Sequence, residues 1–132
     1  MKTTKSRPIE RLLQKLDEKQ AIVKDMGGRE KIEKQHSRGK LTARERVARF
    51  FDPGTFVELG GLVVSQHRDF GMRERYTPAD GVVTGHGKVN GRETCVYATD
   101  FTILAGSAGE SHAAKIAAII DLAGRMRVPV VA

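Results

Sequence analysis

Apolar and polar residues alternate with helical spacing over the first part of the chain. Apolar side chains recur at helical spacing after Pro8. A proline suits the first turn of a helix, because its missing N–H would have no partner there, and Ser6 is the candidate N-cap. The apolar positions are Ile9, Leu12, Leu13, Leu16 and Val23. This narrow stripe predicts an amphipathic helix that packs against a partner surface. Gly27 and Gly28 interrupt the pattern, and a second short, charged helix is predicted over residues 29–36.

A capping box marks the start of a third helix. The Thr42 hydroxyl can accept a hydrogen bond from the Glu45 amide, while the Glu45 carboxylate reaches back to the Thr42 amide. The helix is therefore predicted to begin near Ala43 and to end at the turn residues 52–54. We expect the apolar side chains of this helix to face inward, namely Val47, Phe50 and Phe51. The arginines should point elsewhere, namely Arg44, Arg46 and Arg49.

After Thr55 the apolar pattern changes towards the period of two that is typical of strands. Two short strands are predicted, at residues 56–59 and 62–64. A polar, irregular segment follows at residues 67–78 and predicts a loop.

Asn90-Gly91 is the strongest hairpin signal in the chain, because both residues tolerate the positive φ angles of a type I′ turn. The signal predicts that residues 81–89 pair with residues 92–99. The glycines at 85, 87 and 91 are therefore assigned to the hairpin and not to a phosphate-binding loop.

The C-terminal third predicts a strand, a glycine-rich loop and a long helix. The apolar run at residues 101–104 predicts the strand, and a wide apolar face at residues 109–127 predicts the helix. His112, in the first helical turn, is expected to be a structural or surface residue rather than a catalyst. Residues 128–132 are apolar and predict the beginning of a buried strand in a parallel sheet.

The loop before the long helix is the first candidate site, and it consists of Gly106, Ser107, Ala108 and Gly109. A chain that enters a helix through glycines leaves backbone N–H groups unpaired, and the helix dipole adds partial positive charge, which suits an oxyanion, carboxylate or phosphate. A nucleotide loop is disfavoured, because the spacing matches neither phosphate motif and Lys115 lies too far into the helix. A plain turn and a backbone donor to a thioester oxyanion both stay open.

The net charge of +7 is unevenly distributed. Residues 1–50 hold 15 Lys and Arg against 7 Asp and Glu, whereas residues 51–132 hold 8 against 9. A basic segment of this kind could meet nucleic acid, an anionic lipid surface or a phosphorylated cofactor such as coenzyme A, or it could be a solvated helix face. No aromatic residue precedes Phe50, so stacking on bases has little support and no nucleic-acid partner is expected.

The sequence predicts neither a membrane segment nor a disulfide framework. It has no apolar run of 20 residues and no signal segment, and Cys95 is the single cysteine. Cytoplasm is therefore the default location. Cys95 stands in a strand-like run and is expected to be a small buried hydrophobe rather than a nucleophile.

Residues 27–132 resemble the N-terminal part of the acyl-CoA carboxyltransferase family, which comprises β subunits of biotin-dependent propionyl-CoA and acetyl-CoA carboxylases and their decarboxylase relatives. The resemblance rests on three stretches in the family's order and spacing, the last followed by VPVV. They are GGREKIEKQHSRGKLTARERVARFFDPGTFVELG, TPADGVVTGHGKVNGRE and DFTILAGSAGESHAAKIAAIIDLA.

The resemblance implies an α/β fold that is part of a crotonase-like spiral of strand-strand-helix units. Residues 1–51 would form a basic helical N-terminal arm, and residues 52–132 the truncated start of the carboxyltransferase domain. Family members move a carboxyl group between carboxybiotin, held on a biotinylated carrier or biotin carboxylase subunit, and the α-carbon of a short acyl-CoA. No cofactor would be bound covalently, and the chain would act as a homo-oligomer or with a C-terminal half.

The resemblance also implies roles for particular residues. Backbone N–H groups hold the enolate in this family, so the Gly106-Ser107-Ala108-Gly109 loop is expected to supply one oxyanion donor. Arg44 and Arg46, in the TARER stretch, are candidates for contacts to coenzyme A phosphates. The family's next glycine loop and its biotin half-site lie outside these 132 residues, so the chain alone is expected to be inactive. A non-catalytic module that binds a partner subunit or an anionic polymer through the basic arm is the alternative.

Overall fold

The computed structural model describes residues 7–132, so the predicted Ser6 cap lies outside the described residues. Helices come first in the chain: α1 (Pro8–Asp25), α2 (Arg29–His36) and α3 (Ala43–Phe50). The strands and the last helix follow as β1 (Val57–Leu59), β2 (Val82–Val89), β3 (Arg92–Thr99), α4 (Glu110–Met126) and β4 (Val130–Val131). Short 3₁₀ turns occupy Met72–Glu74, Pro78–Gly81 and Leu104–Gly106.

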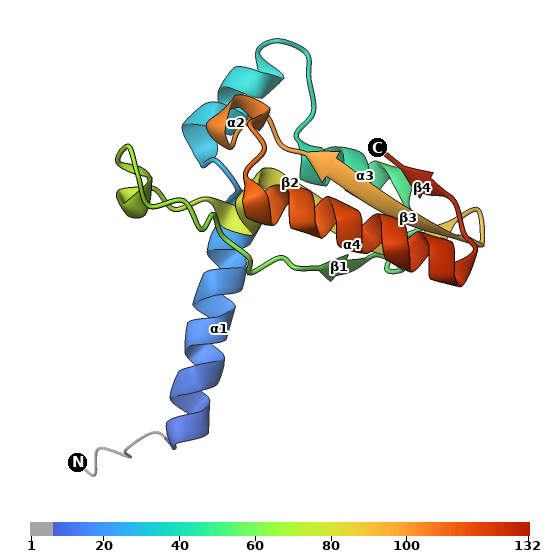
Figure 1. Ribbon diagram of the computed structural model, residues 1–132, viewed down its shortest axis with the longest axis horizontal. Coiled ribbons are helices and arrows are strands. Elements are labelled where there is room, and N and C mark those ends of the chain that lie inside the picture. The colour runs from blue at the N-terminus through green and yellow to red at the C-terminus, as the bar shows by residue number, and fades with distance from the viewer. Residues whose placement is uncertain (1–6) are drawn as a thin grey trace.

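The strands form one mixed sheet in the order β1-β2-β3-β4. β1 and β3 both run antiparallel to β2, and β4 runs parallel to β3 with Cys95 opposite Val130. Helix α4 packs on one face of the sheet and α3 on the other (Figure 1). β2, β3 and α4 therefore make one strand-strand-helix unit, and the predicted α/β class is confirmed.

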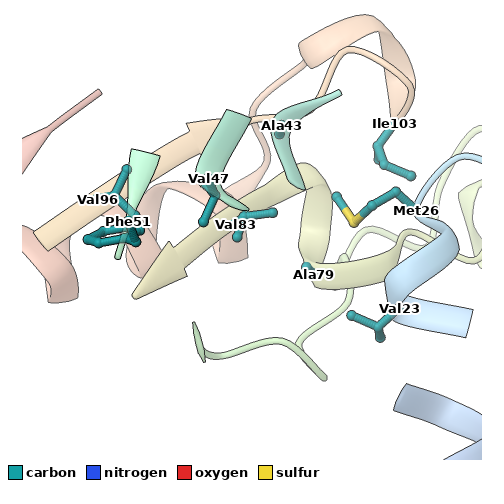
Figure 2. Packing of buried hydrophobic residues seen from close by; sticks show 9 residues of the cluster. All are labelled: Val23, Met26, Ala43, Val47, Phe51, Ala79, Val83, Val96 and Ile103. Carbon is teal, nitrogen blue, oxygen red and sulfur yellow. The ribbon is translucent and has the colours of Figure 1, made fainter. Parts of the chain in front are cut away.

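The larger core lies between α3, the sheet and the end of α1. It joins residues of α1 and α3 to residues of the hairpin and of the turn after β3 (Figure 2). Its buried members are Val23, Met26, Ala43, Val47, Phe51, Ala79, Val83, Val96 and Ile103. A smaller cluster of Cys95, Ile119 and Ala123 lies under α4. Residues on both sides of position 51 share the larger core.

Helix α1 has the predicted amphipathic pattern but is buried only at its C-terminal end. It projects from the rest of the chain (Figure 1), and Val23 is 4% exposed whereas Leu12 is 61% exposed. The other exposed members of the stripe are Ile9, Leu13 and Leu16. The surface that would cover this stripe is not supplied by residues 7–132.

The local signals in the sequence are confirmed. Thr42 Oγ1 accepts from the Glu45 amide at 3.3 Å, and Glu45 Oε2 accepts from the Thr42 amide at 2.7 Å. The hairpin turns at Asn90-Gly91, and both turn amides donate to the Asp52 carboxylate, at 2.9 and 2.8 Å. Gly85 belongs to β2, where a Cβ would run into the Val57 carbonyl of β1.

Two predicted strands are wrong. Residues 62–64 form no strand, because the chain turns after β1 and the Val63 amide donates to Gly60 O at 3.2 Å. Strand β2 is also already paired on both sides, by β1 and β3. Residues 101–104 form a turn, because Asp100 Oδ1 takes the Thr102 amide at 2.7 Å and the Ile103 amide bonds to Asp100 O at 3.2 Å. The parallel strand predicted at residues 128–132 exists as β4, but its two residues are exposed.

Candidate functional site

The first candidate site is the loop of Gly106, Ser107, Ala108 and Gly109, which leads from a 3₁₀ turn into α4. The first two amides are used within the turn, on Ile103 O at 2.9 Å and on Leu104 O at 3.0 Å. The Ser107 hydroxyl donates to Leu104 O as well, at 2.7 Å. Across residues 7–132, the Ala108 and Gly109 amides have no acceptor. These two amides are the backbone donors that the loop has free.

The N-terminus of α4 is capped by a carboxylate from another part of the chain. Asp80 Oδ2 accepts from the His112 amide at 2.7 Å, and His112 Nδ1 lies 2.9 Å from Asp80 O. A carbonyl oxygen only accepts, so this contact assigns the proton to Nδ1. The two residues are 5% and 2% exposed. His112 is therefore a buried structural residue, as the sequence predicted, and together with Asp80 it fixes the start of the helix beside the loop.

Lys115, one turn further along α4, holds the same segment from the other side. Its Nζ donates to Ala79 O at 2.6 Å and also to Val82 O. These carbonyls flank a turn in which Ala79, Asp80 and Gly81 all have positive φ, a costly conformation that the bonds from α4 stabilise. Burial lowers the pKa of Lys115 to about 8, the Arg44 charge acts in the same direction, and the Glu58 and Asp80 carboxylates oppose it. The Lys115 ammonium group is thus bonded to the segment before β2 and does not line the cavity beside the loop, in agreement with its exclusion as a phosphate-loop lysine.

A cavity of about 1050 Å³ lies between the loop and helix α2. Ser107, Ala108 and Gly109 lie along one wall of the cavity. The lining on the side of α2 carries the basic side chains of Lys31 and Lys34 and of Arg38 in the turn after the helix, and Arg75 and the capping Asp80 also line the space. In Figure 1, α2 lies beside the segment that enters α4. The cavity therefore places free backbone amides opposite a cluster of positive charge.

A second cavity, of about 700 Å³, adjoins the first and contains one of the predicted arginines. Gly106 and Arg46 both line it, and Arg38 lines both cavities. Arg46 is exposed and donates from Nη2 to Thr99 O at 3.2 Å. The structure thus brings Arg46 close to the predicted loop.

Arg44 lies elsewhere and lines neither of these two cavities. Its Nη1 and Nη2 bind the Glu58 carboxylate at 2.8 and 2.9 Å, and its Nε donates to Val23 O at 3.1 Å. The Arg44 side chain is only 20% exposed. Arg44 therefore ties α1, α3 and β1 together, and it lies neither on a solvated helix face nor beside the predicted loop.

The basic wall and the Asp80 cap were not among the predicted site residues. Lys31 and Lys34 have the spacing i, i+3, which would have indicated one helical face, whereas Arg38 lies in the turn after α2. Asp80 had no comparable signal, because its contact with His112 spans 32 residues of sequence. Long-range pairs of this kind are set by the fold and leave no pattern in the local sequence.

Other candidate chemistry is limited in the described part of the chain. Cys95 is fully buried against Ile119 and Ala123, as predicted, and burial raises the pKa of its thiol. No cluster of three or more His, Cys, Asp or Glu within residues 7–132 could hold a metal ion. None of the described helices has the length and apolar character needed to span a membrane.

Comparison with known proteins gives consistent results. The carboxyl transferase domain family matches residues 34–132. The chain is 46% identical over 123 residues to methylmalonyl-CoA decarboxylase subunit alpha of Veillonella parvula, covering 93% of this chain and 24% of the relative. It is 45% identical over 120 residues to the propionyl-CoA carboxylase beta chain of Cereibacter sphaeroides, covering 91% and 24%. The chain thus spans about a quarter of the length of these relatives.

Solved structures show the same relationship. The transcarboxylase 12S structure with methylmalonyl-coenzyme A and methylmalonic acid bound superposes with a TM-score of 0.90 at 38% identity. The superposition covers 95% of this chain and 24% of that one. A single-chain, multi-domain long-chain acyl-CoA carboxylase superposes with a TM-score of 0.84 at 34% identity, over 99% of this chain and 14% of the other. These neighbours confirm the predicted partial crotonase-like fold.

Proposed function

Because the chain belongs to the carboxyl transferase domain family, we propose that it forms the N-terminal portion of an acyl-CoA carboxyltransferase subunit. The reaction would move a carboxyl group between carboxybiotin and the α-carbon of a short acyl-CoA such as propionyl-CoA or acetyl-CoA. In the carboxylation direction, the C–N bond of carboxybiotin breaks, a C–C bond forms at the α-carbon, and the α-proton passes to the biotin nitrogen. The protein's task is to hold the acyl-CoA and stabilise its enolate.

The observation that carries this proposal is the cavity of about 1050 Å³ with free amides on one wall and basic side chains on the other. A thioester oxygen that becomes negative in the enolate needs fixed N–H donors, and the Ala108 and Gly109 amides are unpaired in the described chain. Coenzyme A also carries phosphates, which basic side chains bind. The two walls therefore match the two ends of an acyl-CoA.

Within this function we assign the phosphate contacts to the basic wall and to Arg46. Lys31, Lys34 and Arg38 face the larger cavity, and Arg46 lines the adjoining one. Arg44 supports the fold through Glu58 instead. Carboxybiotin would arrive on a biotinylated carrier or a biotin carboxylase subunit, and the carboxyltransferase would work as a homo-oligomer.

Binding of coenzyme A to the 132-residue chain tests the proposal. Replacing Lys31, Lys34 and Arg38 together by Gln should weaken coenzyme A binding about tenfold or more in calorimetric titration, and raising the salt concentration should weaken the wild type in the same way. The matched control replaces Lys15, Lys19 and Lys24 by Gln, which removes the same charge from α1. Absence of coenzyme A binding, or equal losses in both triple variants, would contradict the proposal.

A second function keeps support from one observation, the exposed apolar stripe of α1. A surface of this kind suits a non-catalytic module that binds a partner subunit. Such a module has no need of the cavity, so the stripe variant Leu12→Ser with Leu16→Ser would abolish assembly while coenzyme A binding stays absent. Retained coenzyme A binding in that variant would favour the carboxyltransferase.

A further inference from the structure

The two walls of the larger cavity are joined at their bases by a buried hydrogen-bond relay. The Gly27 amide donates to Thr102 Oγ1 at 3.1 Å, and Thr102 Oγ1 donates to Asp100 Oδ1. The Asp100 amide in turn donates to Gly81 O at 2.8 Å, which fixes Asp100 to the start of β2. Asp100 is fully buried and Thr102 is 4% exposed, so water does not compete for the bond between them, and the bond from the half-buried Gly27 amide is partly shielded.

The place of the relay in the chain relates it to both walls. Gly27 lies two residues before α2, which carries Lys31 and Lys34, and Thr102 lies two residues before the 3₁₀ turn that leads into the loop. The approach is close, because a Cβ at Gly27 would overlap the Thr102 backbone carbonyl. A single hydroxyl therefore fixes the base of one wall against the base of the other.

Helix α2 depends on such end contacts because it has no buried residue of its own. Its C-terminal end is held by His36, whose Nε2 lies 2.9 Å from both oxygens of Glu45. That contact is exposed, with 44% of the His36 side chain accessible. At the other end of the helix the contacts are buried, because the Gly27–Thr102–Asp100 relay lies beside Met26 and Ile103 of the larger core.

We propose that Thr102 is a positioning residue that sets the distance between the basic wall on α2 and the Gly106–Gly109 loop. This inference rests on the proposed function, in which the basic wall holds ligand phosphates and the loop holds the thioester oxygen. Loss of the Thr102 hydroxyl leaves the Gly27 amide without its acceptor, while Asp100 Oδ1 keeps the Thr102 amide, and α2 then samples a range of distances from the loop. A ligand that must reach both walls is affected, whereas a ligand that touches only the loop is not.

The first test measures the distance directly and needs no ligand. Spin labels are attached to Lys34→Cys and Ser107→Cys in a Cys95→Ala background, and the distance distribution is recorded by pulsed electron resonance. Thr102→Val should broaden or shift the distribution, and Thr102→Ser, which keeps the hydroxyl, should restore it. The matched control is Thr94→Val, which removes a buried threonine hydroxyl from β3, away from the cavity. An unchanged distribution in folded Thr102→Val would overturn the proposal.

The second test separates positioning from general damage to the fold. Thr102→Val should weaken binding of coenzyme A about tenfold while binding of S-acetyl-N-acetylcysteamine, a thioester without phosphates, changes less than twofold. Equal losses for both ligands would contradict a positioning role. If neither ligand binds the wild type, the proposed function fails, and the spin-label distances still decide the role of Thr102.

A third measurement covers a Thr102→Val chain that does not fold. In the wild type, hydrogen exchange at the Gly27 amide should be slow, because the amide is bonded to a buried hydroxyl, while the unpaired Ala108 amide should exchange fast. Fast exchange at Gly27 would show that the relay does not persist in solution and would overturn the proposal.

Discussion

The two walls of the larger cavity are built in different ways. Buried groups stabilise the loop wall. The Asp80 carboxylate accepts a hydrogen bond from the His112 amide, and the Lys115 ammonium group donates to two backbone carbonyls. The basic wall is formed by the short helix α2, which has no buried residue, and by Arg38 in the turn after it, and its charged side chains are exposed. A backbone donor works only when its position is fixed, whereas a charge acts over a distance and tolerates motion. Each wall thus has the construction that its proposed role requires.

The largest effect should come from distorting the loop wall. Gly106 has φ +79, so Gly106→Val in a complete, active carboxyltransferase should lower kcat about a hundredfold or more, as expected for a lost oxyanion donor. Ser107→Ala should keep most of kcat, because its hydroxyl bonds only to Leu104 O on an exposed turn. Steady-state kinetics on both variants measure the difference.

The control for backbone strain is Gly54→Val. Gly54 also has a positive φ, and a Cβ there would meet nothing within 4 Å. This variant should lose stability like Gly106→Val but keep kcat in the folded fraction. An inactive Ser107→Ala beside an active, folded Gly106→Val would rule out a backbone donor and require a side-chain mechanism.

A smaller effect should separate the two arginines of α3. Arg44→Gln breaks a half-buried double contact with Glu58 and should lower the free energy of unfolding by about 2 kcal/mol, measured in urea. Arg46→Gln removes an exposed side chain and should change stability by less than about 0.5 kcal/mol. The affinity for coenzyme A should fall several-fold in Arg46→Gln and stay unchanged in Arg44→Gln. A loss of affinity confined to Arg44→Gln would contradict this assignment.

The contrast between the walls also explains what the sequence could predict. The capping box at Thr42 and Glu45 and the turn at Asn90-Gly91 are decided by residues next to each other, and both were predicted correctly. The apolar residues 101–104 predict a strand because Phe101, Ile103 and Leu104 suit one, and this prediction is wrong. The Asp100 carboxylate accepts a hydrogen bond from the Thr102 amide, which a strand would need for pairing. Strand propensities do not account for a side chain that competes for a backbone amide.

The candidate site shows the same division between local and long-range information. The glycine loop could be selected as a candidate because its residues are contiguous, whereas the charge excess of the first fifty residues suggested a phosphorylated partner without indicating the basic wall. The relay from Gly27 to Thr102 spans 75 residues, and the bonds from α4 to Asp80 and its neighbours span 32 to 36. Only the fold brings these groups together, so the supports of the loop had to come from the structure.

The most gradual predicted effect is a pH dependence that belongs to the loop wall alone. The pKa of Lys115 is lowered to about 8 from an ordinary value of 10.5, because the ammonium group is buried. Between these two values the unfolded chain holds a proton that the folded chain has released, so the free energy of unfolding should rise with pH over this interval. Below pH 8 both forms are protonated and this contribution is constant. The gain should not exceed about 1.4 kcal/mol per pH unit.

Urea denaturation of wild type and Lys115→Met between pH 7 and pH 10.5 isolates the contribution, because other groups that titrate in this range are common to both proteins. The difference between the two curves should grow in favour of the wild type as the pH rises above 8. Lys34→Met removes a lysine from the basic wall and leaves Lys115 in place, so this control should keep the wild-type gain. If Lys115→Met follows the wild type in parallel, the ammonium group is not buried in solution. The loop wall would then lack one of the two groups that hold it, and its contrast with the basic wall would be weaker than the structure indicates.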